Sequence, residues 1–129
     1  MAVYQAFLRQ LEEEFKAEMP ELYTHLEELE FELNYFVMKW IMGLFSEDLP
    51  KHLLLSFWDC LCQTDLYMLL CLILTIFRHF ESKLLESDAD GINELLKWEL
   101  KSRLENVPDL VVLSKRRYIK GRLQTNKVS

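Results

Sequence analysis

Apolar residues recur every three or four positions along most of the chain, which is the spacing of amphipathic helices. The first such run, residues 3–18, places its apolar side chains on one side of a helix: Phe7, Leu8, Leu11 and Phe15. The acidic cluster at 12–14 falls mostly on the other side. Pro20 then opens a second, shorter helix, because proline suits the first helical position. Its inner face consists of Leu22, Leu26 and Leu29.

The third predicted helix carries two apolar stripes, and Asn34 is suited to cap its N-terminus. The two stripes are Phe36, Trp40 and Leu44, and Val37, Ile41 and Phe45. Pro50 begins the fourth predicted helix. The inner face of that helix consists of Leu53, Leu54, Phe57, Trp58 and Leu61.

The most apolar stretch runs from Leu66 to Phe77 and contains 12 residues. A membrane-spanning helix needs about 20. The stretch therefore predicts a buried helix, apolar nearly all round, that other elements must cover on more than one side. Either Thr64 or Asp65 can cap it, and the pattern continues to about Leu85.

A sixth helix is predicted from leucines and an isoleucine at helical spacing: Ile92, Leu95, Leu96, Leu100 and Leu104. Ser87, Asp88 and Asp90 all offer caps for it. Pro108 separates a seventh, basic segment around residues 114–123. We therefore expect an all-α fold in two parts, a helical subdomain at 1–108 and a basic C-terminal helix or tail at 109–129.

Composition supports this fold class, since the chain is 50% hydrophobic and has only three glycines and three prolines. The net charge of −6 is uneven: six basic residues and Asp109 give residues 109–129 a charge of +5, which leaves −11 for the remainder. An acidic body disfavours nucleic acid as a partner. The basic segment is either a solvated last helix or a surface that contacts anionic lipid or an acidic protein.

No residue pattern predicts a metal or cofactor site. The odd set Cys60, Cys62 and Cys71 lies in apolar runs, with a C-x-C spacing unlike that of zinc ligands. We expect reduced core cysteines in a cytosolic protein. His25 and His79 are expected at the surface or at its boundary.

Residues 37–60 read VMKWIMGLFSEDLPKHLLLSFWDC. Here one helix ends, Leu49-Pro50 turns the chain because the residue before proline avoids the helical region, and the next helix begins. The aromatic, proline and acidic positions follow the order W-x4-F-S-x2-LP-x7-WD: Trp40, Phe45, Ser46, Leu49, Pro50, Trp58 and Asp59.

This order resembles the C-terminal signature of the TBC domain, the Rab GTPase-activating protein family, and the resemblance covers residues 3–105. It implies a fold of about six to seven helices, packed as the C-terminal subdomain of a TBC-like helical domain. It also implies a Rab-type small GTPase as partner.

Catalysis in that family resembles a two-finger mechanism, with an arginine from I-x-x-D-x-x-R and a glutamine from Y-x-Q-G. An arginine supplied in trans can raise the rate by about 10³–10⁵. This sequence contains neither segment: the adjacent Tyr4-Gln5 lacks the intervening residue and the following glycine. We therefore expect no catalytic residues, no cofactor and no enzyme activity in this chain.

The family-signature residues are expected to be structural. Trp40 and Trp58 lie on apolar helical faces and are predicted to anchor the core. Asp59 follows a tryptophan expected to be buried, so we expect it to form a salt bridge or a hydrogen bond to a neighbouring loop. The alternative is direct contact of Asp59 with a GTPase partner.

Together these features predict a TBC-family protein related to GTPase activation of Rab proteins in membrane trafficking, but catalytically incomplete. Its predicted location is cytoplasmic, with peripheral contact at endomembranes through the basic tail. The alternative is a non-catalytic helical interaction or scaffold protein that pairs with another helical chain, or a truncated product without independent activity.

Overall fold

The computed structural model describes residues 2–128, with side-chain environments up to residue 124. Every regular element of these residues is helical, which confirms the all-α prediction. The helices are α1 (Ala2–Glu18), α2 (Pro20–Glu28), α3 (Leu33–Gly43), α4 (Lys51–Cys62), α5 (Leu66–His79), α6 (Glu81–Leu85), α7 (Ala89–Glu94), a π-helical segment (Leu95–Glu99), α8 (Leu100–Leu104) and α9 (Leu110–Val128). No helix within residues 2–128 is long and apolar enough to cross a membrane.

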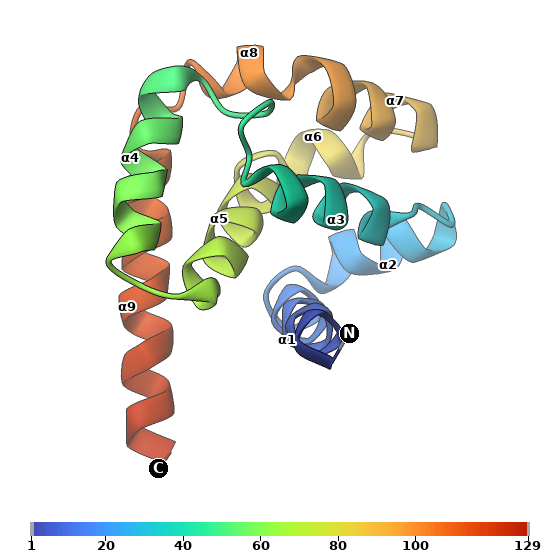
Figure 1. Cartoon of the computed structure of the whole chain (residues 1–129). Helices are drawn as coiled ribbons and strands as arrows, with labels where there is room; N and C mark the ends of the chain where they lie inside the picture. Colours follow the sequence, from blue (N-terminus) through green and yellow to red (C-terminus); the bar gives the residue numbers. More distant parts are fainter. Residues whose placement is uncertain (1, 129) are drawn as a thin grey trace.

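Helix α5 is the centre of the fold. Each residue from Met68 to Phe77 is buried, as expected for a helix that is apolar nearly all round. Helices α1, α4, α6 and α9 all pack against it. In Figure 1, α4 and α9 lie on one side of α5, whereas α1 and α2 lie on the other.

Two predicted caps are confirmed by hydrogen bonds. The Asp65 carboxylate accepts from the backbone N–H of Tyr67 at 3.0 Å, and the Asp88 carboxylate accepts from that of Gly91 at 2.8 Å. The alternative cap Thr64 instead donates its hydroxyl proton to the Cys60 carbonyl at 2.8 Å, inside the end of α4.

The predicted starts of the third and fourth helices differ slightly from the observed ones. Helix α3 begins at Leu33, so Asn34 lies inside it, and Glu32 at the N-cap makes no side-chain capping bond. Pro50 is the N-cap of α4, with extended backbone (φ −56°, ψ 145°), and its carbonyl accepts the first helical hydrogen bond, from Leu54.

Three helix lengths also differ from the prediction. The fifth helix ends at His79, because the backbone of Phe80 leaves the helical region (φ −99°, ψ 11°) and α6 starts anew. The sixth is interrupted by the π-helical segment, whose wider turn lets both Leu95 and Leu96 be buried. The seventh, α9, begins before residue 114 and ends beyond 123.

The end of α3 corrects one apolar stripe. Leu44 was expected beside Phe36 and Trp40, but its side chain is 42% exposed. The cause is backbone geometry: Leu44 and Phe45 both have positive φ (48° and 63°), so the chain leaves the helix after Gly43. Phe45 is thereby folded back into the core, where it is fully buried.

Candidate functional site

The family-signature residues from Trp40 to Trp58 lie at the corner between α3 and α4, which we call the signature corner (residues 36–58). Its centre is Trp40, which is fully buried as predicted. The indole stacks on Phe45, with ring centroids 5.4 Å apart and planes at 21°, and lies 5.9 Å from the ring of Phe77 in α5. Aromatic contact of this kind ties the corner to the central helix.

The proline end of the turn between the two helices is also buried. Leu49 is 1% exposed and Pro50 is buried beside it. Phe45 meets Phe57 of α4 edge to face, with centroids 6.0 Å apart and planes at 84°. Two residues in the left-handed region reverse the chain here, which is a strained arrangement for non-glycine residues and holds only because packing around Phe45 fixes it.

Trp58 has a different role from Trp40. It is half-buried, and its indole N–H donates to the backbone carbonyl of Leu44 at 2.9 Å. That carbonyl belongs to the left-handed turn, where helical hydrogen bonding has ended. Trp58 therefore clamps the end of α3 to α4, which refines the prediction that it anchors the core.

The prediction for Asp59 is wrong. The residue is exposed, and its carboxylate forms no salt bridge or hydrogen bond with the residues whose side chains the structure describes. The reason is position on the helix: Phe57 faces the core, Trp58 the boundary and Asp59 solvent.

The buried acid of the corner is Asp48, which the sequence pattern did not single out. It is 6% exposed and lies 3.7 Å from the Lys39 ammonium group. Burial raises the pKa of Asp48, and Lys39 opposes that rise. The Trp40 indole nitrogen has no hydrogen bond of good geometry, yet the nearby Asp48 carboxylate interacts with it closely enough for the contact to lower the pKa of Asp48.

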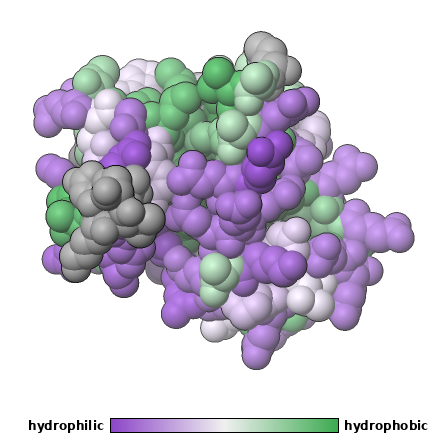
Figure 2. Space-filling view, turned by 90° about the horizontal axis from the view of Figure 1, so that it is seen from below, coloured by the Kyte–Doolittle hydropathy of each residue, from purple (hydrophilic) through white to green (hydrophobic). Residues whose placement is uncertain are grey.

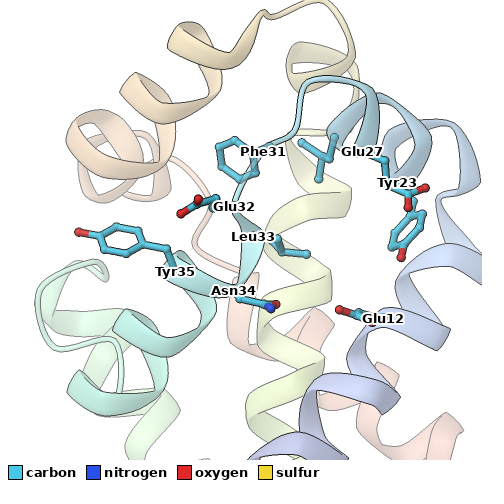
Figure 3. A pocket seen from close by; sticks show the side chains of 9 residues that line it. Glu12, Tyr23, Glu27, Phe31, Glu32, Leu33, Asn34 and Tyr35 are labelled. Carbon is cyan, nitrogen blue, oxygen red and sulfur yellow. The ribbon is translucent and has the colours of Figure 1, made fainter.

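A cleft of about 340 Å³ lies between α1, α2 and the segment that leads into α3. Figure 3 shows Glu12 and Asn34 pointing toward each other across it, with Tyr23 and Glu27 on the α2 side. Burial raises the pKa of Tyr23, and Glu27 and Glu12 raise it further. The cleft combines carboxylates with aromatic walls, so its surface complements a cationic side chain.

A second cleft, of about 290 Å³, has apolar walls from three helices. Its lining residues are Val3, Tyr4, Phe7, Met38, Ile41, Met42, Leu66 and Leu69. Several of these side chains are strongly exposed, Met42 by 80% and Val3 by 69%. Figure 2, which shows the molecule from below, has apolar side chains gathered along the upper edge of the view, while most of the surface seen there is hydrophilic. Such a contiguous apolar area is typical of a contact surface.

Helix α9 is bound to the body by two arginines. The Arg117 guanidinium makes a two-point contact with the Glu18 carboxylate at the end of α1, with one N–O distance of 2.8 Å, and donates to the Thr75 hydroxyl at 3.3 Å. Arg122 pairs with Asp65 and lies 4.9 Å from the centre of the Tyr67 ring. Its hydrogen bond holds the pKa of Asp65 below the usual range.

Sequence reasoning missed a third feature of this contact, Gly121. A Cβ atom at this position would lie 2.2 Å from the Tyr67 hydroxyl oxygen and 2.7 Å from a ring carbon. The two helices approach too closely for a side chain. A single glycine within a helical run was the available signal, because such a residue commonly marks close packing.

The remaining titratable groups suggest no chemistry. All three cysteines are free thiols; burial raises the pKa of Cys71 to about 12, Cys60 is half-buried, and Cys62 is exposed rather than in the core as expected. Among the described residues, no group of three or more His, Cys, Asp and Glu is placed to hold a metal ion. His79 is exposed and His25 half-buried, as predicted.

The fold and the signature corner define an all-α helical module with a buried aromatic cluster between α3, α4 and α5. The family model described as the Rab-GTPase-TBC domain matches residues 1–85 of the chain. The chain belongs to this family, and the predicted resemblance is confirmed.

Two curated relatives are consistent with this assignment. The chain is 26% identical over 102 residues to the Rab GTPase-activating protein eat-17 of Caenorhabditis elegans, a match that covers 79% of this chain and 12% of that protein. It is 29% identical over 82 residues to TBC1 domain family member 12 of Xenopus tropicalis, covering 64% of this chain and 12% of the relative. The matched region thus spans about an eighth of each relative's length.

Proposed function

We propose that this chain is a TBC-family module that binds a Rab-type small GTPase without accelerating GTP hydrolysis by itself. The observation that carries the proposal is the family match over residues 1–85. One of the two relatives is described as a Rab GTPase-activating protein. A Rab-type partner is therefore the first class of protein to test.

The lack of catalysis rests on the residues of this chain. The sequence contains neither the arginine segment nor the glutamine segment that the family resemblance calls for. The signature aromatics Trp40 and Phe45 are fully buried in packing contacts, so they are not available to a nucleotide. Trp58 holds a backbone carbonyl and Asp59 points into solvent.

The test has two separate readouts in lipid-free solution. GTP hydrolysis by a panel of Rab proteins is measured with and without the purified chain, and binding of GTP-loaded Rab is measured by calorimetry. We expect binding to at least one Rab and a change in hydrolysis rate below about tenfold, far under the effect of an arginine finger. Acceleration beyond that would overturn the catalytic part, and absence of binding across the panel would overturn the partner.

A second candidate function is a helical interaction protein that pairs with another helical chain. It is favoured by the apolar cleft, where Met38 and Met42 are exposed beside Leu66. Flexible methionines suit a surface that adapts to an amphipathic helix. A monomer in sedimentation that binds no apolar dye would count against this function. A double variant, Met38→Glu with Met42→Glu, should remove any pairing while preserving the fold, because both side chains are exposed.

We also propose a cytoplasmic, peripheral location at endomembranes and a role in membrane trafficking, with contact through the basic segment 109–129. The division into a helical subdomain at 1–108 and this basic segment stays a prediction. What supports membrane contact is the charge of the segment, which is opposite in sign to that of the rest of the chain. A fluorescent full-length chain expressed in cells should be found both in the cytosol and on endomembranes.

A further inference from the structure

Helix α9 has two faces of different character. Its inner face buries Leu110, Val111 and Ser114, and its two paired arginines, Arg117 and Arg122, also point toward the body. These two cations are already engaged by carboxylates of α1 and of the α5 N-terminus. They are therefore not available to an outside partner.

The outer face of α9 holds the remaining described cations and a stripe of exposed aliphatic side chains. The aliphatic residues are Val112, Ile119 and Leu123, at 50%, 50% and 56% exposure. The exposed cations are Lys115, Arg116 and Lys120. Positions 112, 116, 119 and 123 repeat at intervals of four, three and four, so they share one side of the helix. Residues 110–124 contain no Asp or Glu.

We infer that this outer face of α9 docks on an anionic lipid surface, with the helix lying along the interface. The inference rests on the proposed peripheral location and deepens it, since it names the face and the lipid chemistry. An interfacial helix needs a narrow apolar stripe flanked by Lys and Arg. Val112, Ile119 and Leu123 provide the stripe, and Arg116 and Lys120 provide cations that reach anionic headgroups over their own alkyl stems.

The negative charge of the rest of the chain does not prevent this docking, because the outer face of α9 lies away from the most acidic helices. In Figure 1, α9 lies at one side of the molecule next to α4, whereas α1 and α2 lie on the opposite side. Residues 1–36 contain nine acidic and two basic residues, and most of them belong to α1 and α2. A membrane that meets the outer face of α9 is therefore on the side away from the most acidic helices, so repulsion between them is weakened by distance and by salt.

Cosedimentation of the full chain with vesicles tests the inference without any GTPase. One vesicle preparation is pure phosphatidylcholine, and the other contains about 30% phosphatidylserine at low salt. We expect partitioning onto the anionic vesicles alone. Reversal of two outer charges, Arg116→Glu with Lys120→Glu, should lower the partition coefficient at least about 20-fold. Replacing Ile119 and Leu123 by Gln should remove the part of binding that survives at high salt.

The matched control reverses two exposed lysines elsewhere, Lys83→Glu with Lys101→Glu, and so makes the same change in net charge. It should lower partitioning less than about threefold, because neither residue lies on α9. Circular dichroism should show that every variant keeps its helix content. Equal losses in control and α9 variants, or no binding to anionic vesicles, would overturn the inference.

The same outer-face variants also separate lipid from protein as the occupant. If the wild-type chain forms a lipid-free dimer that Arg116→Glu with Lys120→Glu dissociates, the face is an interface between copies and the inference is wrong. Rab binding in lipid-free solution does not depend on any of these outcomes. The failure of this inference is thus distinguishable from the failure of the proposed function.

Discussion

The signature corner and the inner face of α9 are both packed against α5, but different forces hold them. At the corner, Trp40 is enclosed by aromatic rings, with Phe45 stacked on it and Phe77 of α5 beside it. The inner face of α9 is held by Arg117 on Glu18, by Arg122 on Asp65 and by close approach at Gly121. The corner is mainly an apolar core, whereas the α9 contact combines the buried Leu110 and Val111 with ion pairs that are partly exposed.

Because of this difference, we expect the stability of the two regions to depend on different changes. Apolar burial is lost with side-chain volume and depends little on salt or pH. Ion pairs between half-exposed groups contribute less, and they weaken with salt and with protonation of the carboxylate. The corner should therefore dominate stability, and the α9 contact should be the part of the molecule that solution conditions can adjust.

The largest expected effect is the loss of Trp40. Trp40→Ala removes a fully buried indole and should lower the free energy of unfolding by about 3–5 kcal/mol, measured by urea denaturation. Trp98, which is 74% exposed, is the matched control, and Trp98→Ala should change stability by less than about 0.5 kcal/mol. Similar losses for the two variants would contradict the assignment of the corner as the aromatic core.

Replacing Gly121 by alanine is expected to lower the free energy of unfolding, although Gly→Ala substitutions within helices usually raise it. Gly→Ala inside a helix commonly stabilises it by about 1 kcal/mol. Here the added Cβ would clash with Tyr67, whose hydroxyl donates to Glu14 at 2.9 Å and so resists displacement. Gly121→Ala should destabilise by about 1–3 kcal/mol in the same denaturation assay.

Gly43→Ala serves as the control for that substitution. A Cβ at Gly43 would lie 3.4 Å from the Ser46 hydroxyl oxygen, close to ordinary contact. It is the last residue of α3 and its φ is not positive, so alanine there should be neutral or stabilising. If both alanine variants were stabilising, the close contact between α9 and α5 would not exist.

The helix, turn and helix of the signature corner could be predicted from the sequence, whereas the residue pairs that hold α9 to the rest of the fold could not. Leu49-Pro50 and the spacing of Trp40 and Phe45 define a helix, a turn and a helix by local rules. The arginine pairs join residues 99 and 57 positions apart, a relation that no periodicity contains. At the corner itself the sequence still misplaced the acid. Asp48, in the turn that follows the left-handed Leu44 and Phe45, is buried, whereas Asp59 lies on the solvent side of α4.

A smaller effect is expected at Trp58, where packing and hydrogen bonding can be separated. Trp58→Phe keeps an aromatic ring but removes the N–H that donates to the Leu44 carbonyl. The free energy of unfolding should fall by about 0.5–1.5 kcal/mol, because water can reach this half-buried site. Amide exchange at Leu44 and Phe45 should become faster, since the left-handed turn is no longer clamped. Unchanged stability and unchanged amide exchange would show that the hydrogen bond from Trp58 to the Leu44 carbonyl does not stabilise the turn.

The smallest expected effect on stability is that of Arg122→Gln. This substitution probes the α9 contact directly, because the pKa of Asp65 is measured at its own carboxyl carbon. The hydrogen bond from Arg122 holds the pKa of Asp65 below the usual value of an aspartate carboxyl group. Since the folded-state pKa is depressed, the stabilising contribution of this pair is present above the unfolded value and is lost as pH falls through the folded value. Arg122→Gln should raise the pKa of Asp65 toward its usual value but leave it below that value, because the Tyr67 backbone N–H still donates to the carboxylate.

The measurement is a carboxyl-carbon NMR titration of Asp65 in the wild type and in Arg122→Gln. The accompanying loss of stability should be below about 1 kcal/mol, because the two side chains are 43% and 50% exposed. High salt should shrink the difference at Asp65. An Asp65 pKa that does not respond to Arg122→Gln would mean that α9 is held to α5 without this ion pair, through Arg117 and the close approach at Gly121.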